Sequence, residues 1–227
     1  MNKNLFSRQP AGPPFSGCLQ AFHAGCTALA LALAAAPAAA VTSAARLPPA
    51  LTELAQALEP GDTGGRPYAI VDKLAATIAV FHADGRLAGV APVLLGRSAG
   101  DHTVAGVGER TQSGTLREGD RTTPAGRFIT QPGLNSSGEA VIWVDYASAL
   151  AIHRLRPGAG LAERTRRLAS SRLAERRVSA GCVVVPVAFF DSVVQPTLGI
   201  GAAVVYLMPE RGPWQAVWPQ LARTALP

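Results

Sequence analysis

The residues best suited to chemistry lie in one short stretch, Ser179-Ala180-Gly181-Cys182, which the β-branched run Val183-Val184-Val185 follows. Small residues before the cysteine and a strand-forming run after it predict a tight turn into a strand, with little side-chain bulk over the sulfur. The other two cysteines, Cys18 and Cys26, lie near the N-terminus. If that segment is removed, Cys182 has no disulfide partner, and a free thiol at such a turn is a candidate nucleophile.

A thiol nucleophile needs a base that lies near it in space, although not in sequence. Of the four histidines, His153 is the best candidate because it ends the apolar run Leu150-Ala151-Ile152 upstream of Cys182. His82 adjoins a predicted hairpin turn and His102 lies in a predicted loop, so both are expected on the surface. The competing interpretation is an inert thiol packed beneath its strand, since free cysteine is among the most buried residue types.

The N-terminal 45 residues differ in composition from the rest of the chain. Lys3 and Arg8 precede a long run rich in Ala and Leu, Leu19 to Ala40, which ends in small residues. This pattern is typical of a secretory signal peptide, with a cleavage site at 38–40 or 43–45, and it predicts export to the periplasm or cell wall. Retention of the same run as an uncleaved membrane anchor is the alternative.

Composition and charge exclude several classes of function. The chain has 48% hydrophobic and 16% charged residues, which predicts one globular domain rather than disorder. Its formal net charge is +6, but no basic patch is interleaved with aromatic residues, so we expect no nucleic-acid partner. A basic exported protein is expected to meet anionic wall polymer instead. One cysteine and scattered histidines offer no metal-ligand spacing, so we predict no metal and no cofactor.

Hydrophobic patterning gives a provisional order of elements. Residues 46–67 carry prolines and a short apolar helical pattern, which predicts a linker with one small helix. The segment from Gly96 to Asp120 has no period and is predicted to be a long loop. The expected strands cover 68–72, 77–81, 87–95, 128–130, 141–144, 150–153 and 202–207, with Ala83-Asp84-Gly85 as a hairpin turn.

Two helical segments are expected around Cys182. A helix is predicted over 187–198, and one or two helices over the arginine-rich segment 156–177. The arginines of this segment indicate either a solvated face or an attraction for anionic wall polymer.

Together these motifs resemble the catalytic domain of the YkuD-type L,D-transpeptidases. The resemblance rests on the apolar strand ending in His153, on Ser-x-Gly-Cys before a β-branched run, and on Arg121-Thr122-Thr123-Pro124-Ala125-Gly126-Arg127-Phe128. It covers residues 68–208 and leaves 209–227 as a C-terminal tail. It implies a mainly β domain, an antiparallel β-sandwich with peripheral helices.

The resemblance also implies an activity. Cys182 would be the nucleophile and His153 its general base, in an exported cysteine acyltransferase that forms a Cys182 thioester with peptidoglycan stem peptides and cross-links or remodels the wall. Gly181 and Ser179 are expected to support the oxyanion, and Arg154 and Ala180 to contact the substrate. The expected protein is a monomer that has peptidoglycan as its partner and no stable membrane contact after signal cleavage.

The chain departs from the family at Ala180 and Val184, where the family usually carries polar residues. Apolar side chains there remove hydrogen-bonding partners for the substrate or the base. Two alternatives therefore stand beside the transpeptidase. One is an L,D-carboxypeptidase or amidase that hydrolyses the same acyl-enzyme, and the other is a peptidoglycan-binding protein that has lost turnover.

Overall fold

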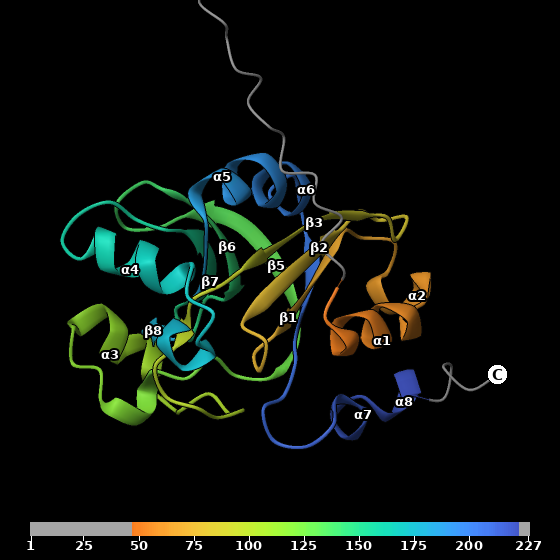
Figure 1. Ribbon diagram of the computed structural model, residues 1–227, viewed down its shortest axis with the longest axis horizontal. Coiled ribbons are helices and arrows are strands. Elements are labelled where there is room, and N and C mark those ends of the chain that lie inside the picture. Colours follow the sequence, from red (N-terminus) through yellow and green to blue (C-terminus); the bar gives the residue numbers. More distant parts are fainter. Residues whose placement is uncertain (1–46, 223–227) are drawn as a thin grey trace, which may run out of the picture. The chain divides into compact units, whose positions relative to one another are not determined.

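The computed structural model describes residues 47–222 of the chain (Figure 1). The predicted signal peptide, 1–45, lies outside the described residues. The strands are β1 (Tyr68–Asp72), β2 (Thr77–Phe81), β3 (Leu87–Pro92), β4 (Leu95–Gly96), β5 (Gly126–Leu134), β6 (Ala140–Asp145), β7 (Leu150–Arg154), β8 (Arg177–Ser179), β9 (Val183–Val185) and β10 (Ala203–Leu207). The α-helices are α1 (Pro49–Ala57), α2 (Pro60–Thr63), α3 (Val107–Ser113), α4 (Leu161–Leu168), α5 (Val187–Phe189), α6 (Gln195–Leu198), α7 (Trp214–Val217) and α8 (Pro219–Ala222). Single turns of other helix types are η1 (Glu118–Asp120), η2 (Leu173–Arg176) and η3 (Phe190–Val194).

Eight strands form one mixed sheet in the order β3-β2-β1-β10-β5-β6-β7-β9, and β4 pairs with β8 apart from it. Strands joined by short connections, such as β1 with β2 and β6 with β7, pair antiparallel. Strands far apart in the chain, β1 with β10 and β7 with β9, pair in parallel, as long connections permit. The prediction of a mainly β domain with peripheral helices is confirmed, and the sheet is mixed.

The two edges of the sheet nearly meet. Leu94, just after the edge strand β3, exchanges two backbone hydrogen bonds with Val184 of the opposite edge strand β9, at 2.8 and 2.9 Å. The sheet therefore curves until its edges are joined by this one bridge, and it encloses an apolar core. The bridge lies two residues after Cys182, so closure of the sheet also fixes the strand that carries the thiol.

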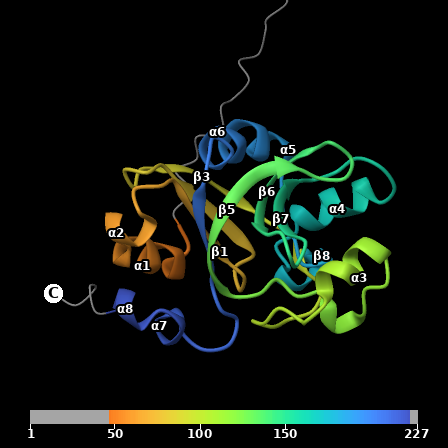
Figure 2. The ribbon, with the colours of Figure 1, turned by 180° about the vertical axis from the view of Figure 1, so that it is seen from behind.

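Both faces of β1 and β10 are buried, which explains their continuous apolar sequence. In β10, Val205 packs into the inner core, whereas Val204 and Tyr206 pack on the other side against α1, α7 and α8. Figure 2 shows these helices gathered on one side of the sheet, away from α3 and α4. Residues 46–67 were predicted to be a linker with one small helix and 209–227 a tail. In the described parts of these segments, 47–67 and 209–222, Leu54 and Trp218 are buried in this second cluster.

Strands form in all the predicted segments, and the hairpin turn at 83–85 is present. The strand predicted over 87–95 is divided into β3 and β4, which belong to different sheets, and β8 was not predicted. The prediction of a structureless loop from Gly96 to Asp120 is wrong, because α3 and η1 lie within it. Glycines in the left-handed conformation, Gly106 and Gly114, bound α3, and few of its side chains are buried, so its sequence shows no apolar period.

The helical predictions on either side of Cys182 are confirmed. The helix expected over 187–198 is a continuous run of α5, η3 and α6, in which Pro196 lies in the first turn of α6. The basic segment 156–177 contains α4 and η2. Within residues 47–222, no helix combines the length and the apolar character needed to span a membrane.

Candidate functional site

Cys182 lies in a tight turn between β8 and β9 and is half-buried. The Ser179 hydroxyl donates a hydrogen bond to the carbonyl oxygen of Cys182 at 2.7 Å and accepts one from the Gly181 N–H at 3.1 Å. One side chain thus closes the turn from both ends. Ser179 fixes the backbone on which the thiol stands, and its hydroxyl is occupied by that structural task.

Gly181 is required by packing of the backbone. Its φ is +133°, and a Cβ there would lie 3.0 Å from the Thr122 carbonyl oxygen. Since its N–H already donates to Ser179, this amide is not free for an oxyanion in the structure. The Thr123 hydroxyl donates to the Gly181 carbonyl at 2.7 Å, so the 122–123 segment holds the turn from below.

His153 lies near the end of β7, whose residues pair in parallel with β9. Its Nδ1 is 2.8 Å from the Arg154 carbonyl oxygen. Because a carbonyl can only accept a hydrogen bond, Nδ1 carries the proton, and Nε2 keeps a free lone pair. The backbone beside His153 therefore selects the tautomer that can act as a base through Nε2.

Cys182 and His153 line the same open cavity, whose volume is about 1060 Å³. Ser179 and Ala180 also line it, so four of the six site residues predicted from the sequence come together there. Gly181 lines a small neighbouring cavity of about 20 Å³. Other parts of the wall come from α3, β5, β6 and the basic segment, and they include Thr111, Gln112, Leu134, Trp143, Arg156 and Arg164.

Burial governs the protonation of both groups. It raises the pKa of the Cys182 thiol, although backbone hydrogen bonds at Ala151 and Cys182 and the charge of Arg156 act in the opposite direction. Burial lowers the pKa of His153 to about 4. At neutral pH the site therefore holds a thiol and a neutral imidazole, so His153 is present in the form that accepts a proton.

Arg154 does not face this cavity. Its guanidinium forms an ion pair with Asp191 of η3 at 3.2 Å, so the structure does not bring it to Cys182. Alternation along β7 explains this, since His153 and Arg154 point to opposite sides of the strand. Two residues that sequence reasoning did not single out, Arg156 and Arg164, reach the cavity instead. Their only sequence signal was the general arginine content of the segment 156–177.

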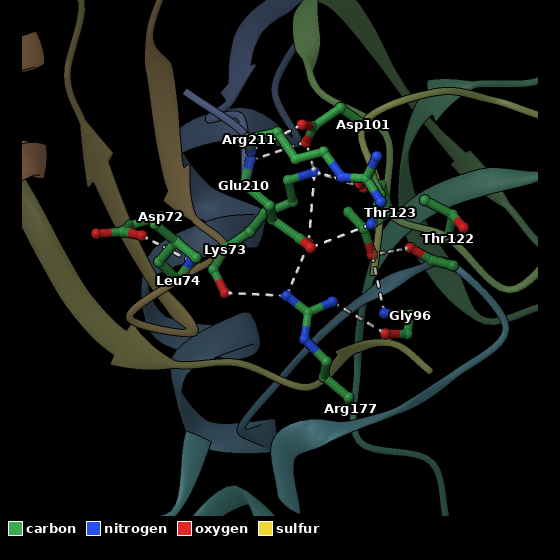
Figure 3. Close-up of polar contacts among 12 residues, drawn as sticks. Asp72, Lys73, Leu74, Gly96, Asp101, Thr122, Thr123, Arg177, Glu210 and Arg211 are labelled. Atoms are coloured by element: carbon green, nitrogen blue, oxygen red, sulfur yellow. Dashed lines mark hydrogen bonds and ion pairs between the residues drawn. The ribbon is translucent and has the colours of Figure 1, made fainter. Parts of the chain in front are cut away.

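Figure 3 shows a set of ion pairs around the buried side chain of Lys73. Lys73 follows β1, and its side chain is fully buried. Its Nζ contacts Asp101 at 2.7 Å and Glu210 at 3.5 Å. Arg177, at the start of β8, contacts Glu210 at 2.7 Å. We call Lys73, Asp101, Arg177 and Glu210 the ion cluster; its two cations and two anions balance.

The ion cluster connects directly to the turn at Cys182. Lys73 Nζ also donates to the Thr123 carbonyl oxygen at 2.8 Å. The hydroxyl of the same threonine accepts from the Gly96 N–H at 2.9 Å and donates to the Gly181 carbonyl. Thr123 is completely buried, so each of its polar atoms needs the partner that it has. A short chain of hydrogen bonds therefore runs from Lys73 through Thr123 to the residue before Cys182.

Hydrogen bonding keeps Asp101 ionised. Burial alone would raise the pKa of Asp101, but hydrogen bonds from Lys73 and from the N–H groups of Glu210 and Arg211 outweigh it and lower that pKa. A lowered pKa means that this carboxylate stabilises the fold above its unfolded pKa. That contribution is lost only when the pH falls through the lowered value, so the ion cluster persists at neutral pH.

Among the described residues, no group of three or more His, Cys, Asp or Glu side chains is arranged to hold a metal ion. No model of a known protein family matches the chain, and no curated protein matches it either. The resemblance to the YkuD-type domain thus remains a prediction from the motifs.

Replacing Lys73 tests the ion cluster. Lys73→Met keeps the length of the side chain but leaves Asp101 with no cationic partner in a buried site. We expect the free energy of unfolding to fall by about 3–5 kcal/mol, as measured by urea denaturation. Arg86→Met is the matched control, because Arg86 forms its 2.7 Å ion pair with Asp84 on an exposed hairpin. Equal effects of the two substitutions would contradict the importance of the cluster.

Proposed function

We propose that this protein is an exported cysteine acyltransferase of the YkuD-type L,D-transpeptidase kind, which acts on peptidoglycan stem peptides and so cross-links or remodels the cell wall. The observation that carries the proposal is the meeting of Cys182 and His153 in one open cavity, where His153 lies on β7 and Cys182 directly precedes the paired strand β9. The sandwich-type fold of that family is part of the proposal. It is supported by the antiparallel runs β1-β2-β3 and β5-β6-β7 within the curved sheet.

Acylation begins when the sulfur of Cys182 attacks the carbonyl carbon between the third and fourth residues of a stem peptide. His153 Nε2 takes the thiol proton as the C–S bond forms and the carbonyl electron pair moves onto oxygen. The tetrahedral intermediate then collapses, the C–N bond breaks, and the imidazolium returns its proton to the amine of the departing D-alanine. A thioester on Cys182 and a neutral His153 remain.

Deacylation repeats these steps with an acceptor amine. The amine attacks the thioester carbonyl, His153 takes the proton that the amine loses, and the thiolate departs and is reprotonated. The product is a new amide between two stem peptides. If water attacks in place of the amine, the same acyl-enzyme yields a free carboxylate, and the reaction is that of a carboxypeptidase or amidase.

The oxyanion needs donors other than the Gly181 amide, which Ser179 occupies. The backbone groups of Ala151 and Cys182 form hydrogen bonds that favour negative charge on the sulfur. Because they act on the sulfur, these groups favour the thiolate that forms as His153 takes the proton and that departs again in deacylation.

A peptidoglycan-binding protein without turnover is the second candidate, and one observation favours it. Burial raises the pKa of the Cys182 thiol, which disfavours the nucleophilic thiolate. Ala180 and Val184 add apolar surface to the cavity wall. A site of this kind could hold a peptide without acylating Cys182.

A carbapenem reports directly on the acyl-transfer machinery, because its ring carbonyl is an acyl donor for a cysteine nucleophile. Intact-protein mass spectrometry is expected to show one adduct per chain. Cys182→Ala is expected to abolish the adduct, and His153→Ala to slow its formation by about 10²–10⁴-fold, the usual contribution of a general base.

Alkylation by iodoacetamide is the control, since it needs an accessible thiol but no acyl transfer. An alkylated protein that forms no carbapenem adduct would contradict the acyltransferase and favour the binding protein. Retention of the adduct in Cys182→Ala would remove this thiol from the mechanism.

The acid limb of acylation tests the role of His153. Only the neutral imidazole can accept the thiol proton, and burial lowers the pKa of His153 to about 4. Because the folded-state pKa is lowered, the base form persists to more acid pH than in a solvated histidine. The carbapenem acylation rate should therefore change little from pH 7 to pH 5, if a circular dichroism spectrum shows an intact fold, and should lose half its value near pH 4. A half-loss near the ordinary histidine pKa of about 6.5 would contradict the buried base.

A further inference from the structure

The wall of the cavity that contains Cys182 carries two guanidinium groups. Arg156 follows β7, and Arg164 lies in α4. Both line the cavity, and among the described residues no Asp or Glu side chain lines it. With His153 neutral, the lining residues carry a formal charge of +2, and Glu139, which pairs with Arg156 at 3.2 Å from outside the lining, offsets part of it. A cavity of one charge sign attracts ligands of the other, and an open, partly solvated wall lets them reach it.

Arg164 has no carboxylate partner among the ion pairs of residues 47–222. Its guanidinium donates to two backbone carbonyls, those of Ala159 at 2.7 Å and Arg156 at 3.0 Å. These bonds fix the group in place without cancelling its charge. Neighbouring arginines of α4 differ, because Arg166 and Arg167 both pair with Glu163 at 2.8 and 2.6 Å. Arg164 therefore keeps its charge at the cavity wall, whereas Arg166 and Arg167 share the negative charge of Glu163.

Arg156 lies close enough to the reacting groups for its charge to act on both. It lowers the pKa of Cys182 and of His153, although burial is the larger influence on each. Its guanidinium pairs with Glu139 at 3.2 Å, and that carboxylate lies outside the cavity lining. Arg156 thus contacts an anion on one side and faces the cavity on the other.

The rest of the wall suits a peptide. Trp143 lies over Gly133, where a Cβ would come within 2.8 Å of its ring, and it makes an edge contact with Tyr146. Asn135 and Gln112 add amide groups to the same cavity. Flat aromatic surface beside amide donors and acceptors is suited to an extended peptide backbone.

We propose that Arg156 and Arg164 form a carboxylate-binding subsite beside Cys182, so that the cavity selects an acidic peptide whose carboxylate lies near the reacting carbonyl. This inference rests on the proposed function for the identity of the reaction, but the anion site exists independently of turnover. It also assigns to Arg156 and Arg164 the substrate contact that the sequence had suggested for Arg154.

Two alkylating agents of nearly equal size measure this subsite. Iodoacetate carries a carboxylate and iodoacetamide does not, and both transfer their carbon to the thiolate with loss of iodide. We divide the iodoacetate rate at Cys182 by the iodoacetamide rate, so that the thiolate fraction cancels. This ratio is then divided by the same ratio for the small neutral thiol N-acetylcysteine amide. We expect this normalised ratio to be raised about tenfold by the nearby positive charge, and to fall towards one in 1 M salt.

The arginine variants identify the source of the preference. Arg156→Gln and Arg164→Gln are each expected to lower the normalised ratio several-fold, and the double variant to bring it near one. Arg154→Gln is the matched control and should leave it unchanged, since Arg154 pairs with Asp191 outside the cavity. The iodoacetamide rate in each variant reports whether the thiol is still accessible in a folded protein.

A normalised ratio near one in the native protein, or one that survives the double substitution, would overturn the subsite. This outcome differs from failure of the proposed function. A raised, arginine-dependent ratio without a carbapenem adduct would support the carboxylate subsite and contradict acyl transfer. A carbapenem adduct with a ratio near one would support acyl transfer and contradict the subsite.

Discussion

The geometry of the candidate site depends on the buried ion cluster beneath it. Its members come from the end of β1, the loop before α3, β8 and the segment after β10, so these four parts of the chain are held together at one point (Figure 3). Burying charges is costly unless each is paired and hydrogen-bonded. Lys73 meets this requirement only if Asp101, Glu210 and the Thr123 carbonyl are all in place. The cluster therefore favours one arrangement of the turn that presents Cys182.

Above the cluster, the site is built for neutral reactants in a positive field. Burial keeps Cys182 as a thiol and His153 as an imidazole, and the Arg154 carbonyl fixes which nitrogen is free. In the proposed reaction, charge develops only during attack, when His153 takes the thiol proton and negative charge forms on the substrate oxygen. Positive groups that interact with a charge present only in the transition state stabilise the transition state more than the bound substrate.

Patterning in the sequence predicted most of the strands, the turn that carries Cys182 and the position of His153 near the end of a strand, because alternation and small-residue turns are local signals. The parallel pairings were beyond it, since they join strands that are distant in the chain. Burial of Lys73 and Thr123 could not be predicted from the sequence either. Lysine is usually a surface residue, and only its partners in the fold show that this one is buried. Arg154 points away from the cavity because of its place in the alternation of β7. Arg156 lines the cavity because of the path of the basic segment, and no local sequence pattern predicts either.

The most direct test of the central claim is turnover of a disaccharide tetrapeptide from peptidoglycan by the purified protein, followed by liquid chromatography and mass spectrometry. The account predicts release of D-alanine, with cross-linked dimers or tripeptides as the second product, and no release from the Cys182→Ala or His153→Ala variants. Absence of D-alanine release by a native protein that iodoacetamide still alkylates at Cys182 would contradict it. The shared cavity of Cys182 and His153 would then be a binding site for peptides.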